Sequence, residues 1–168
     1  PLIDPNSWAA DGATALAEWV PSDDGTKLRY AVQDGGTDWR IVRVMDVATG
    51  AMLSDELRWV KFSGFTWAKD GSGFWYSRFP QPVEGATFQS TNANQALYFH
   101  RIGTPQSADT QVYATPDHPS YSHHAELTDD GRYLLITTTE GTDDRYAVSI
   151  LDMRRPAAGV RPLISGLD

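Results

Sequence analysis

A tight Asp-Gly turn recurs three times along the chain, and this repeat limits the possible folds more than any other feature. The turns are Asp24-Gly25, Asp70-Gly71 and Asp130-Gly131. Each lies between runs rich in aromatic and β-branched residues. Asp-Gly between two such runs predicts a β-hairpin, because glycine accepts the positive φ that a tight turn requires. A hairpin that recurs roughly every 40–60 residues indicates a repeat architecture.

The first and third repeats align without gaps for some distance beyond the turn. The landmarks that they share are Gly35 with Gly141, Asp38 with Asp144, and Asp46 with Asp152. We interpret an acidic residue that recurs at one place in a repeat as architectural. The acidic pairs at 23–24, 129–130 and 143–144 fall in expected turns, where Asp accepts backbone N–H bonds.

Each repeat is expected to contain four strands. In the first repeat these are Ala13–Val20, Lys27–Val32, Trp39–Val47 and Ala51–Ser54. In the second they are Val60–Ala68, Gly73–Phe79, Gln95–Ile102 and Gln111–Ala114. In the third they are Tyr121–Leu127, Arg132–Thr138, Asp144–Asp152 and Arg161–Ile164. Four short antiparallel strands in each repeat are typical of the blades of a β-propeller.

The fold class is therefore all-β, with blades over roughly residues 13–54, 60–114 and 121–165. Propellers typically have 4–8 blades, so three blades would form an arc of a larger ring with exposed edges. Pro1–Asp4 is expected to be the outer strand of a preceding blade, and residues 166–168 the start of a following one. A β-sandwich is the structural alternative, and the repeat in register disfavours it.

Composition narrows the classes of partner and cofactor. The formal net charge of −8 disfavours a nucleic-acid partner, because phosphate binding needs clustered Lys and Arg. The absence of Cys excludes disulfides and thiolate metal sites. No apolar run approaches ~18 residues, so no membrane-spanning segment is expected. The sequence assigns no cellular compartment, and the candidates are the cytoplasm and, if a leader peptide was removed, the bacterial periplasm.

The sequence offers few candidates for catalysis or metal binding. It contains no Gly-x-Ser-x-Gly pentapeptide, and Ser63 and Ser72 are expected to be structural. His123 and His124 are adjacent on an expected strand, so their side chains should point to opposite faces rather than to one metal. His100 is isolated in the sequence. We expect no metal and no cofactor.

Two further features are candidates for a functional role. Pro80–Asn94 is a long polar connection between two strands, and connections of this length are either functional or disordered. Arg78 follows an aromatic strand, where a cation can pair with a neighbouring domain or extend its charge to solvent over apolar surface.

Several ordered blocks resemble the propeller of the prolyl oligopeptidase family, and together they run along nearly the whole chain. These blocks are residues 2–6, 36–39, 57–63, 67, 70–78, 94–106 and 125–133. The segment at Ser122, His123 and His124 departs from the family pattern. The resemblance implies a seven-bladed propeller joined to an α/β-hydrolase domain that carries a Ser-Asp-His triad and cleaves short peptides after proline. That domain would not be part of this chain.

The resemblance also implies roles for individual residues. Phe62 matches an aromatic that projects into the substrate pocket. The alternative is a structural role for Phe62 in packing between blades. Thr142 lies in the turn from which the family's third blade makes another substrate contact, although the family often has a different residue there. The long connection would lie at the domain interface and help to gate the entry of substrate. The expected interface residues are Arg78, Pro80, Glu84, Phe88 and Asn94. The expected partners are proline-containing peptides and the hydrolase domain of the same parent chain.

A second hypothesis comes from a different functional class, because many propellers are scaffolds that bind protein partners without catalysis. The coding sequence after Asp168 would distinguish the two. A Gly-x-Ser-x-Gly elbow followed by Asp and His would support the peptidase, whereas ring closure without a hydrolase domain would support the scaffold.

Overall fold

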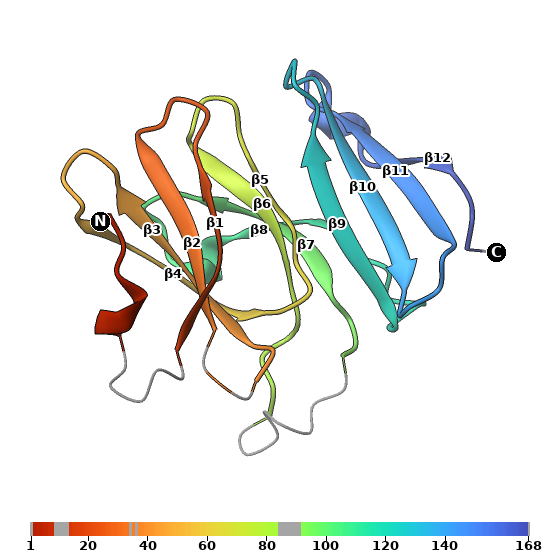
Figure 1. Cartoon of the computed structure of the whole chain (residues 1–168). Coiled ribbons are helices and arrows are strands. Elements are labelled where there is room, and N and C mark those ends of the chain that lie inside the picture. Colours follow the sequence, from red (N-terminus) through yellow and green to blue (C-terminus); the bar gives the residue numbers. More distant parts are fainter. Residues whose placement is uncertain (1, 9–13, 34, 36, 84–91, 168) are drawn as a thin grey trace.

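Three separate four-stranded sheets stand next to one another in the computed structural model (Figure 1). The structure describes residues 2–8, 14–33, 35, 37–83 and 92–167. Within each sheet the strands follow sequence order, and neighbours pair in antiparallel fashion. This is the all-β arrangement of three blades that the repeat predicts.

The first blade contains β1 (Ala15–Pro21), β2 (Lys27–Gln33), β3 (Arg40–Asp46) and β4 (Met52–Val60). The second contains β5 (Phe65–Trp67), β6 (Gly73–Arg78), β7 (Ala96–Arg101) and β8 (Thr110–Tyr113). The third contains β9 (Tyr121–Leu127), β10 (Tyr133–Glu140), β11 (Tyr146–Asp152) and β12 (Arg161–Ile164).

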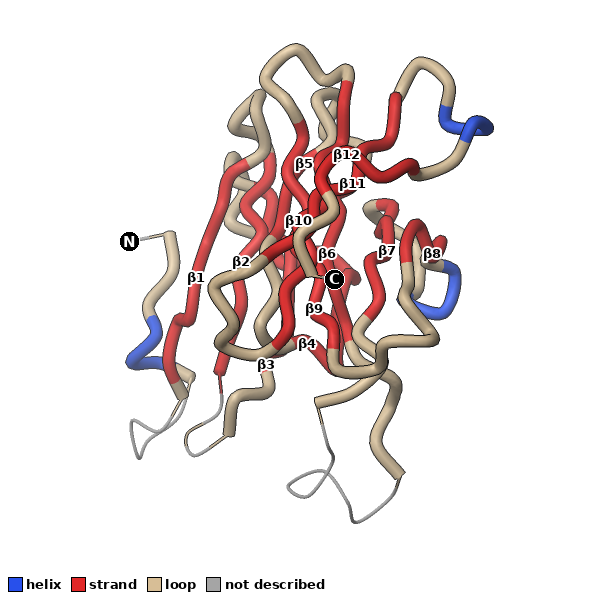
Figure 2. The backbone as a smooth tube through the Cα atoms, turned by 90° about the vertical axis from the view of Figure 1, so that its right-hand side faces the viewer, coloured by secondary structure: helices blue, strands red, loops and turns tan. Residues whose placement is uncertain are grey.

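Three short 3-10 helices, η1 (Pro5–Ser7), η2 (Gln106–Ala108) and η3 (Pro156–Ala158), lie outside the sheets (Figure 2). No helix in the described part of the chain has the length and apolar character needed to cross a membrane.

The strand register separates two kinds of connection. The three Asp-Gly hairpins emerge at one end of the blades. The connections β2–β3, β4–β5, β6–β7 and β10–β11 emerge at the opposite end, which we call the lower end after its place in Figure 1. The pairs Arg40↔Val60, Phe65↔Tyr76 and Thr139↔Tyr146 lie close to this end.

Apolar side chains fill the two spaces between the three blades. Because side chains alternate along a strand, Phe74 and Tyr76 of β6 face the first blade, whereas Trp75 faces the third. The core between the first two blades comprises Ala31, Val42, Val44, Leu57, Val60, Trp67, Phe74 and Tyr76. The core between the second and third comprises Ala68, Trp75, Leu97, Ala125, Leu127, Leu134, Ile136 and Leu151.

Polar contacts join the innermost strands of successive blades. The indole N–H of Trp67 donates to the carbonyl of Val20 at 3.1 Å, which connects β5 to β1. The backbone N–H of Leu127 donates to Thr66 Oγ1 at 3.2 Å, which connects β9 to β5. These bonds fix the order of the blades around a common inner edge.

One predicted strand is wrong. The apolar run Val60–Ala68 is not continuous, because β4 extends to Val60 and β5 begins only at Phe65. The fourth strand of the first blade is correspondingly longer than the predicted Ala51–Ser54. Trp59 and Phe62 have φ values of 62° and 51°, and these left-handed residues turn the chain from one blade to the next. The predicted bounds of β9 and β12, in contrast, are confirmed.

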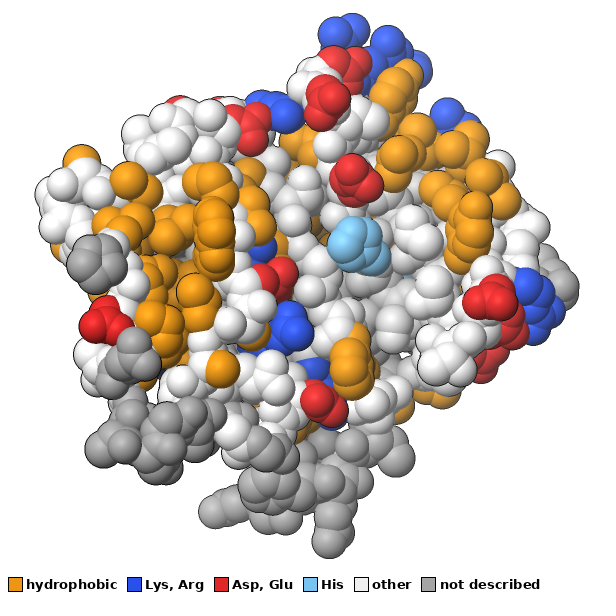
Figure 3. All heavy atoms as spheres, viewed as in Figure 1, with side chains coloured by type: hydrophobic (Ala, Val, Ile, Leu, Met, Phe, Trp, Pro, Cys, Tyr) orange, Lys and Arg blue, Asp and Glu red, His pale blue; other side chains and the backbone are white. Residues whose placement is uncertain are grey.

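The outer faces of the first and third blades carry exposed apolar side chains, which Figure 3 shows at the two sides of the molecule. On the first blade, Leu2, Ile3, Leu16 and Trp19 are among the residues lining a hollow of about 370 Å³. The described residues 2–4 pair with no strand of the three sheets, and their assignment to a preceding blade stays a prediction.

Candidate functional site

The connection between β4 and β5 presents Phe62 to solvent. This side chain is 56% exposed, although phenylalanine is normally buried. The φ of 51° at Phe62 is unusual for a bulky side chain, because Cβ then approaches the following carbonyl oxygen. Such backbone strain costs about 1–3 kcal/mol and is found most often at functional sites. The exposed, strained aromatic is therefore the first candidate for contact with a ligand.

Lys61 anchors the connection from its buried side. It is only 8% exposed, and its Nζ lies 4.0 Å from the centre of the Trp39 ring and 5.6 Å from that of Phe79. The same Nζ also lies 6.0 Å from the centre of the Phe62 ring. Burial lowers the pKa of Lys61, and the nearby Asp38 carboxylate opposes this effect. The buried Lys61 thus holds the connection in place, and the neighbouring Phe62 is exposed to solvent.

Gln95 contacts this connection from the second blade, and sequence reasoning did not identify it as a site residue. Its side-chain amide donates to the carbonyl oxygens of Lys61 and Phe62, both at 3.2 Å. Its carbonyl oxygen accepts the backbone N–H of His123 at 2.7 Å. Gln95 therefore joins the Phe62 connection to the third blade.

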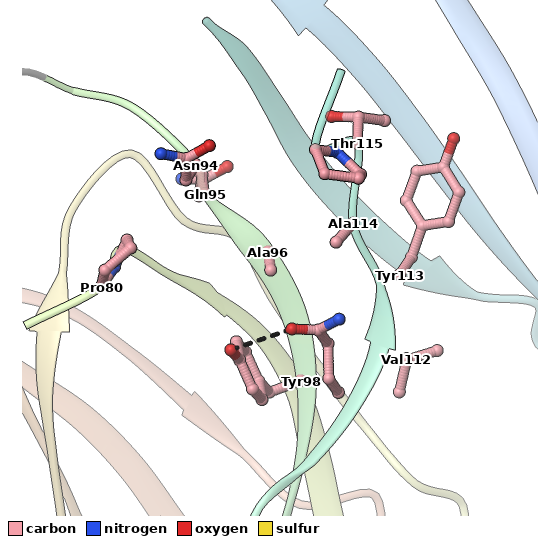
Figure 4. Close-up of a pocket in the computed structure, with 11 residues that line it drawn as sticks. Pro80, Asn94, Gln95, Ala96, Tyr98, Val112, Tyr113, Ala114 and Thr115 are labelled. Carbon is pink, nitrogen blue, oxygen red and sulfur yellow. Dashed lines mark hydrogen bonds between the residues drawn. The ribbon is translucent and has the colours of Figure 1, made fainter. Parts of the chain in front are cut away.

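The β6–β7 connection lies at the same lower end. The Arg78 guanidinium carbon sits 4.1 Å from the centre of the Tyr98 ring. Pro80 and Tyr98 line both a cavity of about 560 Å³ (Figure 4) and a second one of about 330 Å³. Asn94 has a φ of 61°, and its N–H donates to the carbonyl of Pro119 at 2.7 Å. The predicted interface residues Glu84 and Phe88 lie outside the described residues.

Thr142 is exposed in the turn between β10 and β11, on the third blade. The topology thus places Phe62, Arg78, Pro80, Asn94 and Thr142 at one end of the molecule. Residues from the first two blades come into direct contact there, because the N–H of Phe79 donates to the carbonyl of Trp59 at 3.0 Å.

His100 is not isolated, and the prediction that it stands alone is wrong. Its Nε2 lies 2.8 Å from Asp55 Oδ1 and its Nδ1 lies 2.7 Å from Asp109 Oδ1. Tyr76 donates to the other Asp109 oxygen at 2.6 Å, and the N–H of Gly103 donates to Asp55 at 2.7 Å. Burial lowers the pKa of His100, but the hydrogen bonds to the two carboxylates outweigh it and raise this pKa from 6.5 to about 9.

The charged imidazole therefore links β4 of the first blade to β7 of the second. It lies inside the interface between the blades, with a fully buried side chain, and so has a structural role rather than access to a substrate.

The adjacent histidines of β9 point to opposite faces, as predicted. His123 is 1% exposed and its ring contacts the hydroxyls of Thr138 and Thr115, whereas His124 is exposed. Burial lowers the pKa of His123 to about 4, so it is neutral at pH 7. Within the described residues, no group of three or more His, Cys, Asp or Glu side chains is arranged to hold a metal ion.

The expected structural roles of turn residues are also observed. Asp24, Asp130 and Asp143 each accept the backbone N–H of the residue two positions later, at 3.0, 3.0 and 2.8 Å. Ser63 is structural too, because its hydroxyl oxygen accepts the N–H of Ser77 at 2.9 Å.

Comparison with known proteins identifies the family. The family model described as the prolyl oligopeptidase N-terminal beta-propeller domain matches residues 2–168. The chain belongs to this family. A prolyl endopeptidase of Elizabethkingia meningoseptica is 33% identical over 99% of the chain, and a prolyl oligopeptidase A of Amanita bisporigera is 32% identical over 94%. The chain covers 23% of the length of each of these relatives.

Solved structures of the family share the fold of this propeller segment. One, from a structural study of two prolyl endopeptidases, is 46% identical and superposes with a TM-score of 0.86, covering 99% of this chain and 23% of that one. Prolyl oligopeptidase B of Galerina marginata, bound to a 35mer substrate, is 29% identical with a TM-score of 0.82, covering 97% and 23%. The predicted fold class and family are therefore confirmed.

Proposed function

We propose that this chain is the propeller segment of a proline-specific serine endopeptidase, which cleaves short peptides on the carboxyl side of proline. Catalysis would belong to an α/β-hydrolase domain elsewhere in the parent chain, since this segment contains no nucleophile elbow. The segment would contribute a substrate contact and part of the entrance. Membership of the prolyl oligopeptidase family supports this proposal and does not favour the scaffold alternative.

The observation that carries the proposal is the state of Phe62. More than half of this aromatic side chain, 56%, is exposed to water although its backbone is strained. A peptide side chain placed against the ring would remove both surfaces from water, which stabilises the complex by roughly 25 cal/mol per Å² of apolar area. Phe62 would therefore bind the substrate, with Thr142 as a second contact from the third blade.

The β6–β7 connection would meet the hydrolase domain and regulate entry. Arg78, Pro80 and Asn94 lie at the same end as Phe62, and we assign Glu84 and Phe88 to this interface on the family resemblance. A rim that closes around the substrate would exclude folded proteins and admit short peptides. Arg78 supplies a cation there, held over the Tyr98 ring.

Kinetics of the full-length protein test this proposal. A fluorogenic peptide with an internal proline should be hydrolysed, and a fluorophosphonate probe should label one serine. Phe62→Ala should lower kcat/KM by about tenfold, the scale set by losing apolar contact in a pocket. Met52→Ala is a matched control, because Met52 is 54% exposed but lies at the opposite end of β4. Equal kinetics for Phe62→Ala and wild type would contradict the pocket role, and absence of turnover would contradict the activity.

A further inference from the structure

Gln95 combines deep burial with a complete set of polar partners at the Phe62 connection. The side chain is 1% exposed and lies immediately before β7, next to Asn94 (Figure 4). Its three hydrogen bonds reach two other blades: the carbonyls of Lys61 and Phe62 follow β4 of the first blade, and the N–H of His123 belongs to β9 of the third. Through these bonds, one side chain of the second blade contacts residues of all three blades.

The partners fix the orientation of the amide group. Two carbonyl oxygens require donors, which only the NH₂ group supplies, and the His123 N–H requires an acceptor, which only the Oε1 atom supplies. Reversing the amide would place oxygen against two oxygens and N–H against N–H. The two amide hydrogens therefore serve two successive carbonyl groups, one each.

This geometry bears directly on the strained residue. The left-handed conformation of Phe62 directs the Lys61 and Phe62 carbonyls towards the same donor group. Without that donor, the buried Lys61 carbonyl and the partly buried Phe62 carbonyl would lose this partner, and the local advantage of the strained conformation would disappear. The aromatic ring would then leave its exposed position or move between several.

We propose that Gln95 is the positioning residue that holds Phe62 in its substrate-facing conformation. Because Gln95 directly follows Asn94, the same side chain also couples Phe62 to the end of the β6–β7 connection. A displacement of that connection would change the position of the pocket aromatic. This inference rests on the proposed function of Phe62.

A second anchor keeps the effect of Gln95 local. The Ser63 hydroxyl donates to the carbonyl of Gly64 at 2.8 Å and accepts the N–H of Ser77 at 2.9 Å. These bonds attach the connection to β6 independently of Gln95. Loss of the Gln95 donors should therefore disturb residues 61 and 62 without detaching the whole connection.

Gln95→Glu is the most direct variant, because glutamate has nearly the same shape and keeps the acceptor for His123. It replaces the NH₂ group by an oxygen that faces two carbonyl oxygens. In the full-length enzyme we expect kcat/KM for a proline peptide to fall about tenfold, the factor that 1.4 kcal/mol represents. The loss should appear mainly as a higher KM if Phe62 contributes binding to ground state and transition state alike.

Gln106→Glu is the matched control. Gln106 accepts the N–H of Arg58 at 3.0 Å and donates to the Arg58 carbonyl at 2.9 Å and to the Tyr76 hydroxyl at 3.0 Å, so its amide also joins the first two blades but does not contact Phe62. This variant should keep kcat/KM within about twofold of wild type. An equal loss in both variants would show that Gln95 has only a structural role.

A double-mutant cycle separates this inference from the proposed function. If Gln95 acts through Phe62, then Gln95→Glu should have no further effect in a Phe62→Ala background. If the two losses of kcat/KM multiply in the double variant, Gln95 acts independently of Phe62. That result would overturn the positioning role and leave the pocket role intact. A Phe62→Ala variant with wild-type kinetics would overturn the proposed function itself.

A spectroscopic readout keeps the inference testable without catalysis. Fluorine NMR of the protein with 4-fluorophenylalanine in place of Phe62 should give one sharp signal, which shifts or broadens in Gln95→Glu and stays unchanged in Gln106→Glu. If Gln95→Glu does not fold, the milder Gln95→Asn, which keeps the amide but shortens its reach, should give the same change. An unchanged fluorine signal in a folded Gln95 variant would refute the proposal.

Discussion

The buried imidazole between Asp55 and Asp109 predicts a specific dependence of stability on pH. His100 has a pKa of about 9 in the folded protein and 6.5 as a model value. A group whose pKa is raised by folding stabilises the protein fully below its unfolded pKa, and this contribution disappears as pH rises through the folded pKa. The expected loss therefore lies between about pH 6.5 and pH 9.

The magnitude follows from the size of the shift. At about 1.4 kcal/mol for each pKa unit, the shift of His100 corresponds to about 3 kcal/mol of stability at neutral pH. Removing one partner of a buried ion pair typically costs about 3–5 kcal/mol, which agrees with this value. His100→Gln should thus destabilise the propeller by about 3 kcal/mol at pH 6.5, because both carboxylates lose their cation.

Urea unfolding of the full-length protein, followed by Trp fluorescence at several pH values, measures the effect. The free energy of unfolding of the wild type should fall by about 3 kcal/mol between pH 6.5 and 9.5. The His100→Gln variant should start lower and lack this decrease, so that the two curves approach each other near pH 9.5. A flat wild-type profile, or the same slope in both proteins, would refute the assignment of a charged imidazole.

Three further predictions concern the Phe62 connection and the blade interface. Phe62→Gly should be about 1 kcal/mol more stable in urea unfolding than Phe62→Ala, because both variants lack the ring but only glycine accepts a φ of 51° without strain; equal stability of the two variants would contradict the strain. Gly64→Ala should destabilise by about 1 kcal/mol or less in a thermal melt, because the new Cβ collides with the far end of the exposed His124 side chain, which can move, and His124→Ala should remove this loss. Burial raises the pKa of Asp55, but hydrogen bonds from His100 and the Gly103 N–H outweigh this effect and lower the pKa. The ionised Asp55 therefore contributes stability above about pH 4, and this contribution should be lost as the pH falls below that value. Asp55→Asn should make the loss of stability on acidification smaller.

The repeat of hairpins was sufficient to predict the order of strands and blades. Asp-Gly turns and alternating side chains are local signals, so β9 and β12 could be placed at their observed bounds. The break between β4 and β5 carries one local signal, the dipeptide Ser63-Gly64, and the apolar residues on both sides outweighed it. Trp59, Val60, Phe62 and Phe65 are all residues that favour strands, and nothing in their identity indicates positive φ.

The contacts that define the site are long-range, which is why the sequence alone could not reveal them. Asp55 and His100 are far apart in the chain and meet only because β4 of one blade packs near β7 of the next. Gln95 likewise meets Phe62 across a blade interface. In contrast, family resemblance directed attention to Phe62 and Thr142, because it carries positional information that composition and periodicity lack.

The central claim is that Phe62 contacts the peptide substrate. Its most direct test is photo-crosslinking of the full-length protein with p-benzoylphenylalanine in place of Phe62, using a labelled proline-containing peptide and a control protein with the same group in place of Met52. We predict a covalent adduct with the peptide at position 62, reduced by excess unlabelled peptide, and none at position 52. Equal labelling at the two positions, or none at position 62, would contradict the account.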